Sequence, residues 1–221
     1  MQYDKQKDGS FKPLKQQSVD TGLGVERVIT ILQGLDDNYL TKQFYPIIEK
    51  VEEITGKKYK TNKRAMRIIA DHIRAAVFIL GDERSVVPSN LDQGYILRRF
   101  IRRTIRHLRS LGVDIIKDDY TVILAKLVIK MYKGEYPEFE GKKKFILQEL
   151  QNEERKFEKT LEKGLREFEK MSDDNIITGK DAFLLFQSYG FPLEMTAELA
   201  IEKDVKLDEE AFHEEYKKHQ E

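Results

Sequence analysis

The stretch YILRRFIRRTIRHLR, residues 95–109, decides the fold class, because its residues sort onto two faces only if the chain is helical. At about 100° per residue, six arginines fall within about 140° of the helix circumference, and apolar residues fill the remainder. The pattern therefore predicts an amphipathic helix over 94–111. Its basic face holds Arg98, Arg99, Arg102, Arg103, Arg106 and Arg109, and its apolar face holds Leu97, Phe100, Ile101, Ile105 and Leu108.

Segments on both sides of this helix show the same helical period. Apolar residues recur at helical spacing over 22–33, 38–55, 64–80, 119–132 and 142–171. Gly34 and Gly56 are placed to end the first two helices. Three short helices should follow, the first opened by a capping box of Thr178 and Asp181 and the last capped by Asp208.

The first 20 residues differ from the rest and read as extended and turn-like, with Asp8-Gly9 as a turn signal. We therefore expect a mainly α fold. It would be a multi-helix bundle with a short N-terminal strand-and-turn segment and a small three-helix C-terminal lobe.

Charge is uneven along the chain, although the 39 Lys and Arg balance the 39 Asp and Glu. Residues 60–110 hold 12 basic and 4 acidic residues, whereas residues 135–221 hold 14 basic and 23 acidic ones. This asymmetry points to a polyanionic partner for the middle of the chain. The chain has no Cys, which excludes disulfides and thiolate metal sites and fits a cytoplasmic location. The longest apolar runs, about eight residues, are far below the ~20 of a membrane span, so we expect no membrane partner.

The basic face of residues 95–109 is the strongest sign of function that the residues give by themselves. Six guanidinium groups repel each other unless negative charge lies across them, and residues 95–113 contain no Asp or Glu. Arg rather than Lys favours bidentate contact with phosphate. The alternatives are a merely solvated face, arginines paired with acids of the C-terminal half, or a membrane-surface helix. We favour a solvent-facing surface that binds phosphates.

Five strings resemble, in order and spacing, the alanine-specific family of class II aminoacyl-tRNA synthetases. SVDTGLGVER at 18–27 is similar to the third class-defining motif in its alanine-specific form. The others are MRIIADHIRA at 66–75, PSN at 88–90 with QGYILRRFIRR at 93–103, EERKFEKTLEKG at 153–164, and ITGKDAFLLFQSYGFPLEMT at 177–196. The resemblance covers nearly the whole chain, and five strings in order are far more specific than any one alone.

The resemblance implies an ATP site at the first string, and the full enzyme would use ATP and Mg. In the family, the position of Arg27 contacts an ATP phosphate and that of Asp20 contacts the amino group of alanine. Gly22 and Gly24 let the backbone approach a nucleotide closely because they carry no Cβ. Without the resemblance, these glycines would more simply shape a strand-to-helix turn.

The first two class II motifs and the family's editing domain have no match in this sequence. We therefore expect a fragment of a longer enzyme that is inactive and monomeric by itself, with no bound cofactor and no zinc or other metal. The expected divisions are 1–35, the end of the catalytic domain with a remnant of its antiparallel sheet; 36–134, a helical lobe that binds the acceptor stem; and 135–221, the long helix with a small C-terminal lobe.

The resemblance also implies how tRNA(Ala) would be read. Family members recognise a G·U pair at the third position of the acceptor stem, through an Asn and an Asp in opposite grooves. Asn90 matches the Asn, although turn statistics alone would make it a turn residue or helix cap. Gln187 stands where the family usually has Asp, which puts strict G·U selection in doubt. The tRNA backbone would lie on Arg64, Arg67, Arg74, Arg98, Arg99, Arg102, Arg103 and Arg106, which give affinity without sequence information.

Two other functions stay open at this point. One is a stand-alone helical RNA-binding module without a catalytic past, which would have no need of the string GLGVER at 22–27. The other is a scaffolding protein with residues 142–171 as a coiled-coil element, although that segment does not keep strict heptads. A failure to bind RNA at any salt concentration would favour the scaffold.

Overall fold

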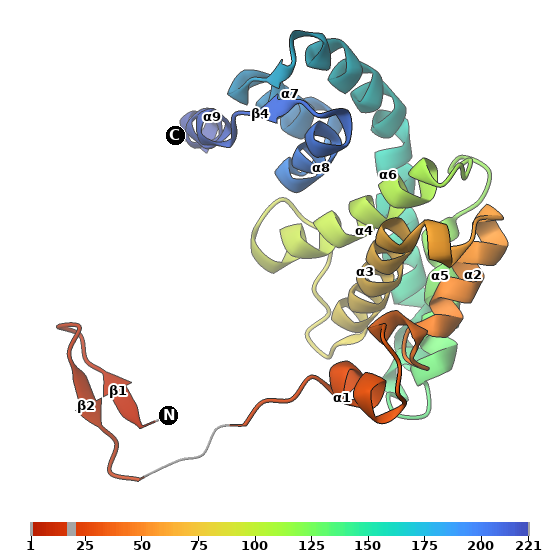
Figure 1. The fold of residues 1–221 in the computed structure, drawn as a ribbon, viewed down its shortest axis with the longest axis vertical. Coiled ribbons are helices and arrows are strands. Elements are labelled where there is room, and N and C mark those ends of the chain that lie inside the picture. Colours follow the sequence, from red (N-terminus) through yellow and green to blue (C-terminus); the bar gives the residue numbers. More distant parts are fainter. Residues whose placement is uncertain (1, 17–20, 221) are drawn as a thin grey trace. The chain divides into compact units, whose positions relative to one another are not determined.

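The computed structural model describes residues 2–16 and 21–220, which fall into two compact units within 1–45 and 46–221. The described part is mainly helical, with only short strands, as the sequence predicted. Figure 1 traces the order of the elements along the chain. The predicted divisions at residues 35 and 134 remain predictions.

The N-terminal unit contains a hairpin and a short helix. β1 (Tyr3–Lys5) pairs antiparallel with β2 (Phe11–Pro13), and the turn between them uses Gly9 at φ +84°. Ser10 donates a backbone hydrogen bond of 2.9 Å to the Asp8 carboxylate, which closes the predicted turn. α1 (Val25–Leu32) follows and ends before Gly34, whose φ is +65°.

The helix predicted over 38–55 is two elements, so that prediction is wrong in one respect. A single 3-10 turn, η1 (Asn38–Leu40), precedes α2 (Tyr45–Thr55). Pro46 explains the break, because proline lacks an N–H and is tolerated only in the first turn of a helix. α2 therefore has to begin beside Pro46.

A bundle of long helices forms the larger part of residues 46–221. The 3-10 turn η2 (Tyr59–Thr61) leads into α3 (Lys63–Gly81), which packs along α4 (Asp92–Ser110). α5 (Tyr120–Tyr132) and the first half of α6 (Glu138–Met171) complete this bundle. Its core consists of fully buried side chains that include Ile69, Ile73, Val77, Leu97, Ile101, Ile105, Leu124, Val128, Ile146 and Leu150.

A small lobe follows the second half of α6, which extends from the bundle to the C-terminal helices (Figure 1). Its elements are η3 (Ser172–Asp174), β3 (Ile176–Ile177), α7 (Gly179–Tyr189), α8 (Leu193–Lys203), β4 (Lys206–Leu207) and α9 (Glu209–Gln220). β3 and β4 form a parallel pair, with Ile177 opposite Leu207.

The caps predicted for the small lobe are confirmed. Thr178 and Asp181 form a complete capping box at the start of α7, and the Asp208 carboxylate accepts a hydrogen bond of 3.0 Å from Ala211 N at the start of α9. Gly164 lets the lobe approach α6 closely, since a Cβ at this position would collide with the Phe191 ring. The lobe is thus held against the helix that also forms part of the bundle.

Candidate nucleic-acid interface

α4 is amphipathic in the structure, as predicted. Leu97, Ile101, Ile105 and Leu108 are fully buried. These side chains recur every three or four residues and face the bundle, where α3 is the main neighbour. The arginines are therefore carried on the opposite side, toward α6 and α8.

Three of the arginines form a row of ion pairs with α8. Arg99 pairs with Glu194, Arg103 with Glu198, and Arg106 with Glu202. The partners advance by about one helical turn at each step on both helices. α4 and α8 therefore run in the same direction along this row.

The remaining arginines of α4 meet carboxylates of α6. Oε1 of Glu153 lies 2.7 Å from both Nε and Nη2 of Arg102, and 3.2 Å from Nε of Arg98. Arg109 donates a hydrogen bond of 2.5 Å from Nε to Glu162. Glu153 is 1% exposed, so this carboxylate is removed from water and neutralised by guanidinium groups.

The prediction that this face is open to solvent is wrong. The exposed fraction of the side chain is 28% for Arg99, 19% for Arg103 and 4% for Arg106. The acidic C-terminal part folds back across α4, so the arginines pair with the chain's own carboxylates. This is the alternative in which acids of the C-terminal half neutralise the basic face.

At the centre of the row, the pKa values of Glu198 and His107 are shifted from their ordinary values. Burial would raise the pKa of Glu198, but the adjacent His107 and Arg103 side chains outweigh burial and lower that pKa to about 2. Burial also lowers the pKa of His107, since desolvation penalises the imidazolium more than Glu198 stabilises it. Glu198 is therefore ionised throughout the physiological pH range, and His107 is neutral near pH 7.

The two residues predicted to read a base pair line the same cavity. Asn90 lies just before α4 and Gln187 lies in the last turns of α7, yet both border a cavity of about 400 Å³. Both side chains are exposed, so they are accessible from solvent. Arg98 and Arg102 also border this cavity, together with the aromatic side chains Tyr95, Phe186, Tyr216 and His219.

Arg98 and Arg102 fix the two sides of this cavity. Arg98 Nη1 donates a hydrogen bond to the side-chain oxygen of Asn90. Arg102 Nη1 donates a hydrogen bond of 2.5 Å to the carbonyl oxygen of Gly190, the residue that ends α7 in a left-handed conformation. Burial raises the pKa of Tyr95 to about 12, so its phenol stays protonated and can donate.

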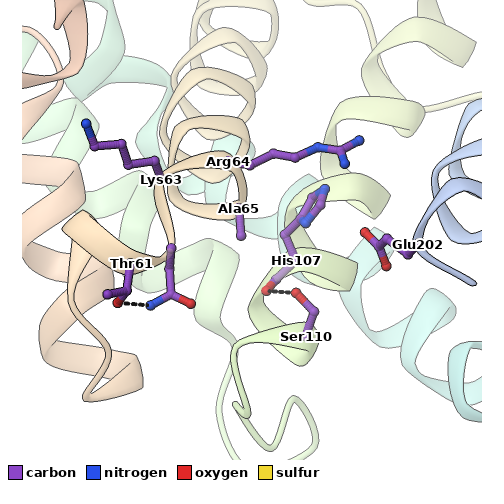
Figure 2. A pocket seen from close by; sticks show the side chains of 8 residues that line it. Thr61, Lys63, Arg64, Ala65, His107, Ser110 and Glu202 are labelled. Atoms are coloured by element: carbon purple, nitrogen blue, oxygen red, sulfur yellow. Dashed lines mark hydrogen bonds between the residues drawn. The ribbon is translucent and has the colours of Figure 1, made fainter.

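A second, smaller cavity of about 230 Å³ lies at the start of α3. Figure 2 shows side chains that line it, with Arg64 from α3, His107 and Ser110 from α4, and Glu202 from α8. The Arg64 side chain is 58% exposed. Of the other predicted contacts, Arg67 donates a hydrogen bond of 2.8 Å to the Tyr59 hydroxyl, and Arg74 one of 3.4 Å to the Tyr132 hydroxyl.

Comparison with known proteins identifies the family. A model of the family described as tRNA synthetases class II (A) matches residues 1–221. The chain belongs to this family. It is similar over its whole length to proteins named alanine–tRNA ligase from Treponema pallidum, at 45% identity, and Borrelia hermsii, at 47%. Over 96% of its length it is 41% identical to the chloroplastic/mitochondrial alanine–tRNA ligase of Populus trichocarpa.

The chain spans 37% and 38% of the length of the two bacterial relatives and 23% of the plant one. The resemblance based on five sequence strings is thereby confirmed for the alanine branch of the family. A helical module unrelated to synthetases is no longer an alternative, since the family match includes residues 18–27.

Three of the residues predicted to contact ATP, Gly22, Gly24 and Arg27, lie in the described part of the chain, at or before the start of α1. Gly24 is the N-cap of α1, and no side chain of this residue caps the helix. The carbons of Arg27 lie 3.5–3.8 Å from the place that a Cβ on Gly24 would take, so the arginine folds over this helix start. Asp20, predicted to contact alanine, lies outside the described residues.

The carboxylates that pair with α4 were missed by the sequence reasoning. A signal existed, because Glu194, Glu198 and Glu202 recur every four residues and match the spacing of the arginines. The aromatic residues of α9 that border the larger cavity, Tyr216 and His219, carried no such signal.

Within residues 2–16 and 21–220, no three His, Cys, Asp or Glu side chains gather as metal ligands would. In the same part of the chain, no helix combines the length and apolar character that a membrane span requires. The expected absence of zinc remains a prediction.

Proposed function

We propose that this chain is the part of an alanine–tRNA ligase that binds the acceptor stem of tRNA(Ala) and reads its third base pair. One observation carries the proposal: Asn90 and Gln187, nearly a hundred residues apart, border the same cavity. Matching positions of the family contact that pair from opposite grooves. A cavity between the two side chains is the arrangement that such two-sided contact needs.

The chemistry of the two side chains suits a base edge. The Asn90 oxygen accepts a hydrogen bond from Arg98, which leaves its amide nitrogen to donate to a base. The side chain of Gln187 makes no hydrogen bond to the residues that the structure describes, so its carboxamide can both donate and accept. An Asp in this place only accepts and would demand a donor such as the guanine amino group. We propose that Gln187 makes the enzyme tolerate or prefer a third pair other than G·U.

The ion pairs of α4 leave fewer arginines available for contact with the RNA backbone than the sequence predicted. Arg64, Arg67 and Arg74 lie on the neighbouring helix α3, so we propose these three as backbone contacts. Arg98 and Arg102 border the cavity, but Glu153 already holds both, so we assign them to the cavity wall. Arg99, Arg103 and Arg106 already hold carboxylates of α8. We propose that these three keep the small lobe in place instead of touching RNA.

The activity named for the relatives, attachment of alanine to tRNA, is extended to this chain as a proposal for the whole protein. Cleavage of a phosphoanhydride bond of ATP, bound with Mg, would supply the free energy that activates alanine. Gly22 and Gly24 would let a triphosphate approach the start of α1, and Arg27 would neutralise part of its charge. Asp20 would hold the amino group of alanine.

Fluorescence anisotropy tests the proposal with acceptor-stem RNA hairpins that differ only at the third pair, as G·U, G·C or A·U. The chain should discriminate between them by about 1–3 kcal/mol, the usual cost of a wrong base pair. Asn90→Ala should abolish this discrimination, and Gln187→Asp should shift it toward G·U. Equal affinity for all three hairpins would contradict base-pair reading. A strong G·U preference unchanged in Gln187→Asp would refute the role of Gln187.

A further inference from the structure

Both walls of the cavity between Asn90 and Gln187 depend on one buried carboxylate. Glu153 lies on α6, far from both Asn90 and Gln187 in the sequence. Its Oε1 lies 3.2 Å from Arg98 Nε and 2.7 Å from Arg102 Nε. At 1% exposure it is almost completely shielded from water.

Arg98 connects Glu153 to Asn90. Arg98 Nη1 donates a hydrogen bond to the Asn90 oxygen, and Arg98 Nε forms an ion pair at 3.2 Å with Glu153, without a hydrogen bond. An amide side chain presents either its oxygen or its nitrogen, and the partner of one atom decides which atom faces outward. With the oxygen held by Arg98, Asn90 presents N–H donors. Its base-edge target is therefore an acceptor.

Arg102 connects Glu153 to the end of α7. Arg102 contacts Glu153 with Nε and Nη2 and uses Nη1 to hold the Gly190 carbonyl oxygen at 2.5 Å. Gly190 ends α7 at φ +69°, three residues after Gln187. The carbonyl that Arg102 holds is thus at the end of the helix turn that carries Gln187, so Arg102 sets the position of this wall.

We propose that Glu153 is a positioning residue for base-pair reading, because it orients Asn90 through Arg98 and Gln187 through Arg102. The inference rests on the proposed function of the cavity. Without the carboxylate, two adjacent guanidinium groups repel each other and separate. Asn90 and the end of α7 then lose their fixed positions even though neither is itself altered.

The test uses Glu153→Gln, which keeps the shape of the side chain and removes its charge. Glu162→Gln is the matched control, since Glu162 also lies on α6 and pairs with an arginine of α4, but that arginine, Arg109, borders neither cavity. Affinities of the G·U, G·C and A·U hairpins are measured for the wild-type chain and both variants, with circular dichroism to confirm folding.

Glu153→Gln should reduce the ratio of affinities between best and worst hairpin by about tenfold, while affinity for the worst hairpin changes less than about threefold. Glu162→Gln should keep the wild-type ratio. The effects of Glu153→Gln and Asn90→Ala on the ratio should also be less than additive, because one acts partly through the other. A merely structural role would weaken all hairpins alike and leave the two effects additive.

An unchanged ratio in folded Glu153→Gln overturns the positioning role and leaves the proposed function intact. Equal affinity of the wild-type chain for all three hairpins overturns both. If Glu153→Gln fails to fold, Arg98→Lys carries the test, because lysine keeps the charge but cannot bridge Glu153 and Asn90. It should lower the ratio as well, and a wild-type ratio in Arg98→Lys overturns the proposal.

Discussion

Arg102 on α4 donates a hydrogen bond of 2.5 Å to the carbonyl oxygen of Gly190, 88 residues further along the chain. The contact joins the helix that carries the basic face to the end of the helix that carries Gln187. Glycine suits this position, since its φ is +69° and a Cβ on Gly190 would force the Arg102 guanidinium to shift. This hydrogen bond thereby holds the small C-terminal lobe against α4, at the edge of the candidate interface.

Gly190→Ala should destabilise the chain by about 2 kcal/mol, because it combines a strained positive φ with the collision against Arg102. Urea unfolding measures the change. Gly112→Ala is the control, since Gly112 also has a positive φ, +92°, but has open space around it. Its cost should be about 1 kcal/mol. Equal costs for both variants would show that the Arg102 contact contributes nothing.

Glu198→Gln should cost about 3 kcal/mol of unfolding free energy at pH 7, because it leaves the mostly buried Arg103 without its carboxylate partner, whereas Arg106 keeps Glu202. Glu194→Gln should cost less than about 1 kcal/mol, since the Glu194 side chain is 45% exposed. Chemical denaturation of the two variants compares them directly. A Glu194 variant as unstable as the Glu198 variant would contradict this ranking.

The low pKa of Glu198 also predicts a pH dependence. Its folded value of about 2 lies below the ordinary value of 4.5, so its contribution to stability is present above pH 4.5 and is lost as pH falls toward 2. The difference between the wild-type chain and Glu198→Gln should therefore shrink from pH 5 to pH 2.5. A constant difference would contradict the assigned ionisation.

Glu154 should make the chain less stable as pH rises from 5 to 8. Its carboxylate accepts backbone hydrogen bonds of 3.0 Å from Tyr120 and 2.9 Å from Thr121 at the start of α5. Burial nevertheless raises its pKa from 4.5 to about 7, so the folded chain keeps a proton that the unfolded chain has lost.

The stabilisation that protonated Glu154 gives the folded chain is thus complete below pH 4.5 and is lost as pH rises through about 7. Over that interval the wild-type chain should lose up to about 3 kcal/mol more stability than Glu154→Gln. Thermal or urea unfolding at pH 5, 6.5 and 8 gives the comparison. Parallel pH profiles for the two proteins would contradict the raised pKa.

Arg64→Ala should weaken binding of all stem hairpins about equally and lower the slope of log affinity against log salt by about 1, if Arg64 meets one phosphate. Lys159→Ala is the control, since Lys159 is an exposed cation of α6 that borders neither cavity. It should leave the slope unchanged. An identical slope for Arg64→Ala and the wild-type chain would exclude the phosphate contact.

The helices were largely predictable because each depends on a local period and a local stop signal. α3, α4, α5 and α6 lie close to their predicted ranges, and the caps of α7 and α9 depend on residues within a few positions. The exception, the break before α2, also had a local cause in Pro46. The apolar stripe over 38–55 continues across this proline, but the helix does not.

The partners of the basic face were not predictable in the same way. Arg103 and Glu198 are 95 residues apart, and no local pattern states which helix faces will meet. Residues 95–113 contain no acids, but acids of α8 lie next to these arginines in space. Asn90 and Gln187 could be named from the resemblance, but only the fold shows that they border the same cavity.

Site-directed photocrosslinking tests the central claim most directly. The chain has no Cys, so Gln187→Cys or Asn90→Cys introduces a single thiol that can carry a photoreactive group. With an acceptor-stem hairpin bound, both positions should crosslink to the third base pair and its immediate neighbours, and Lys159→Cys should give none. Crosslinks from both positions that map to the loop or the opposite end of the stem would contradict the account.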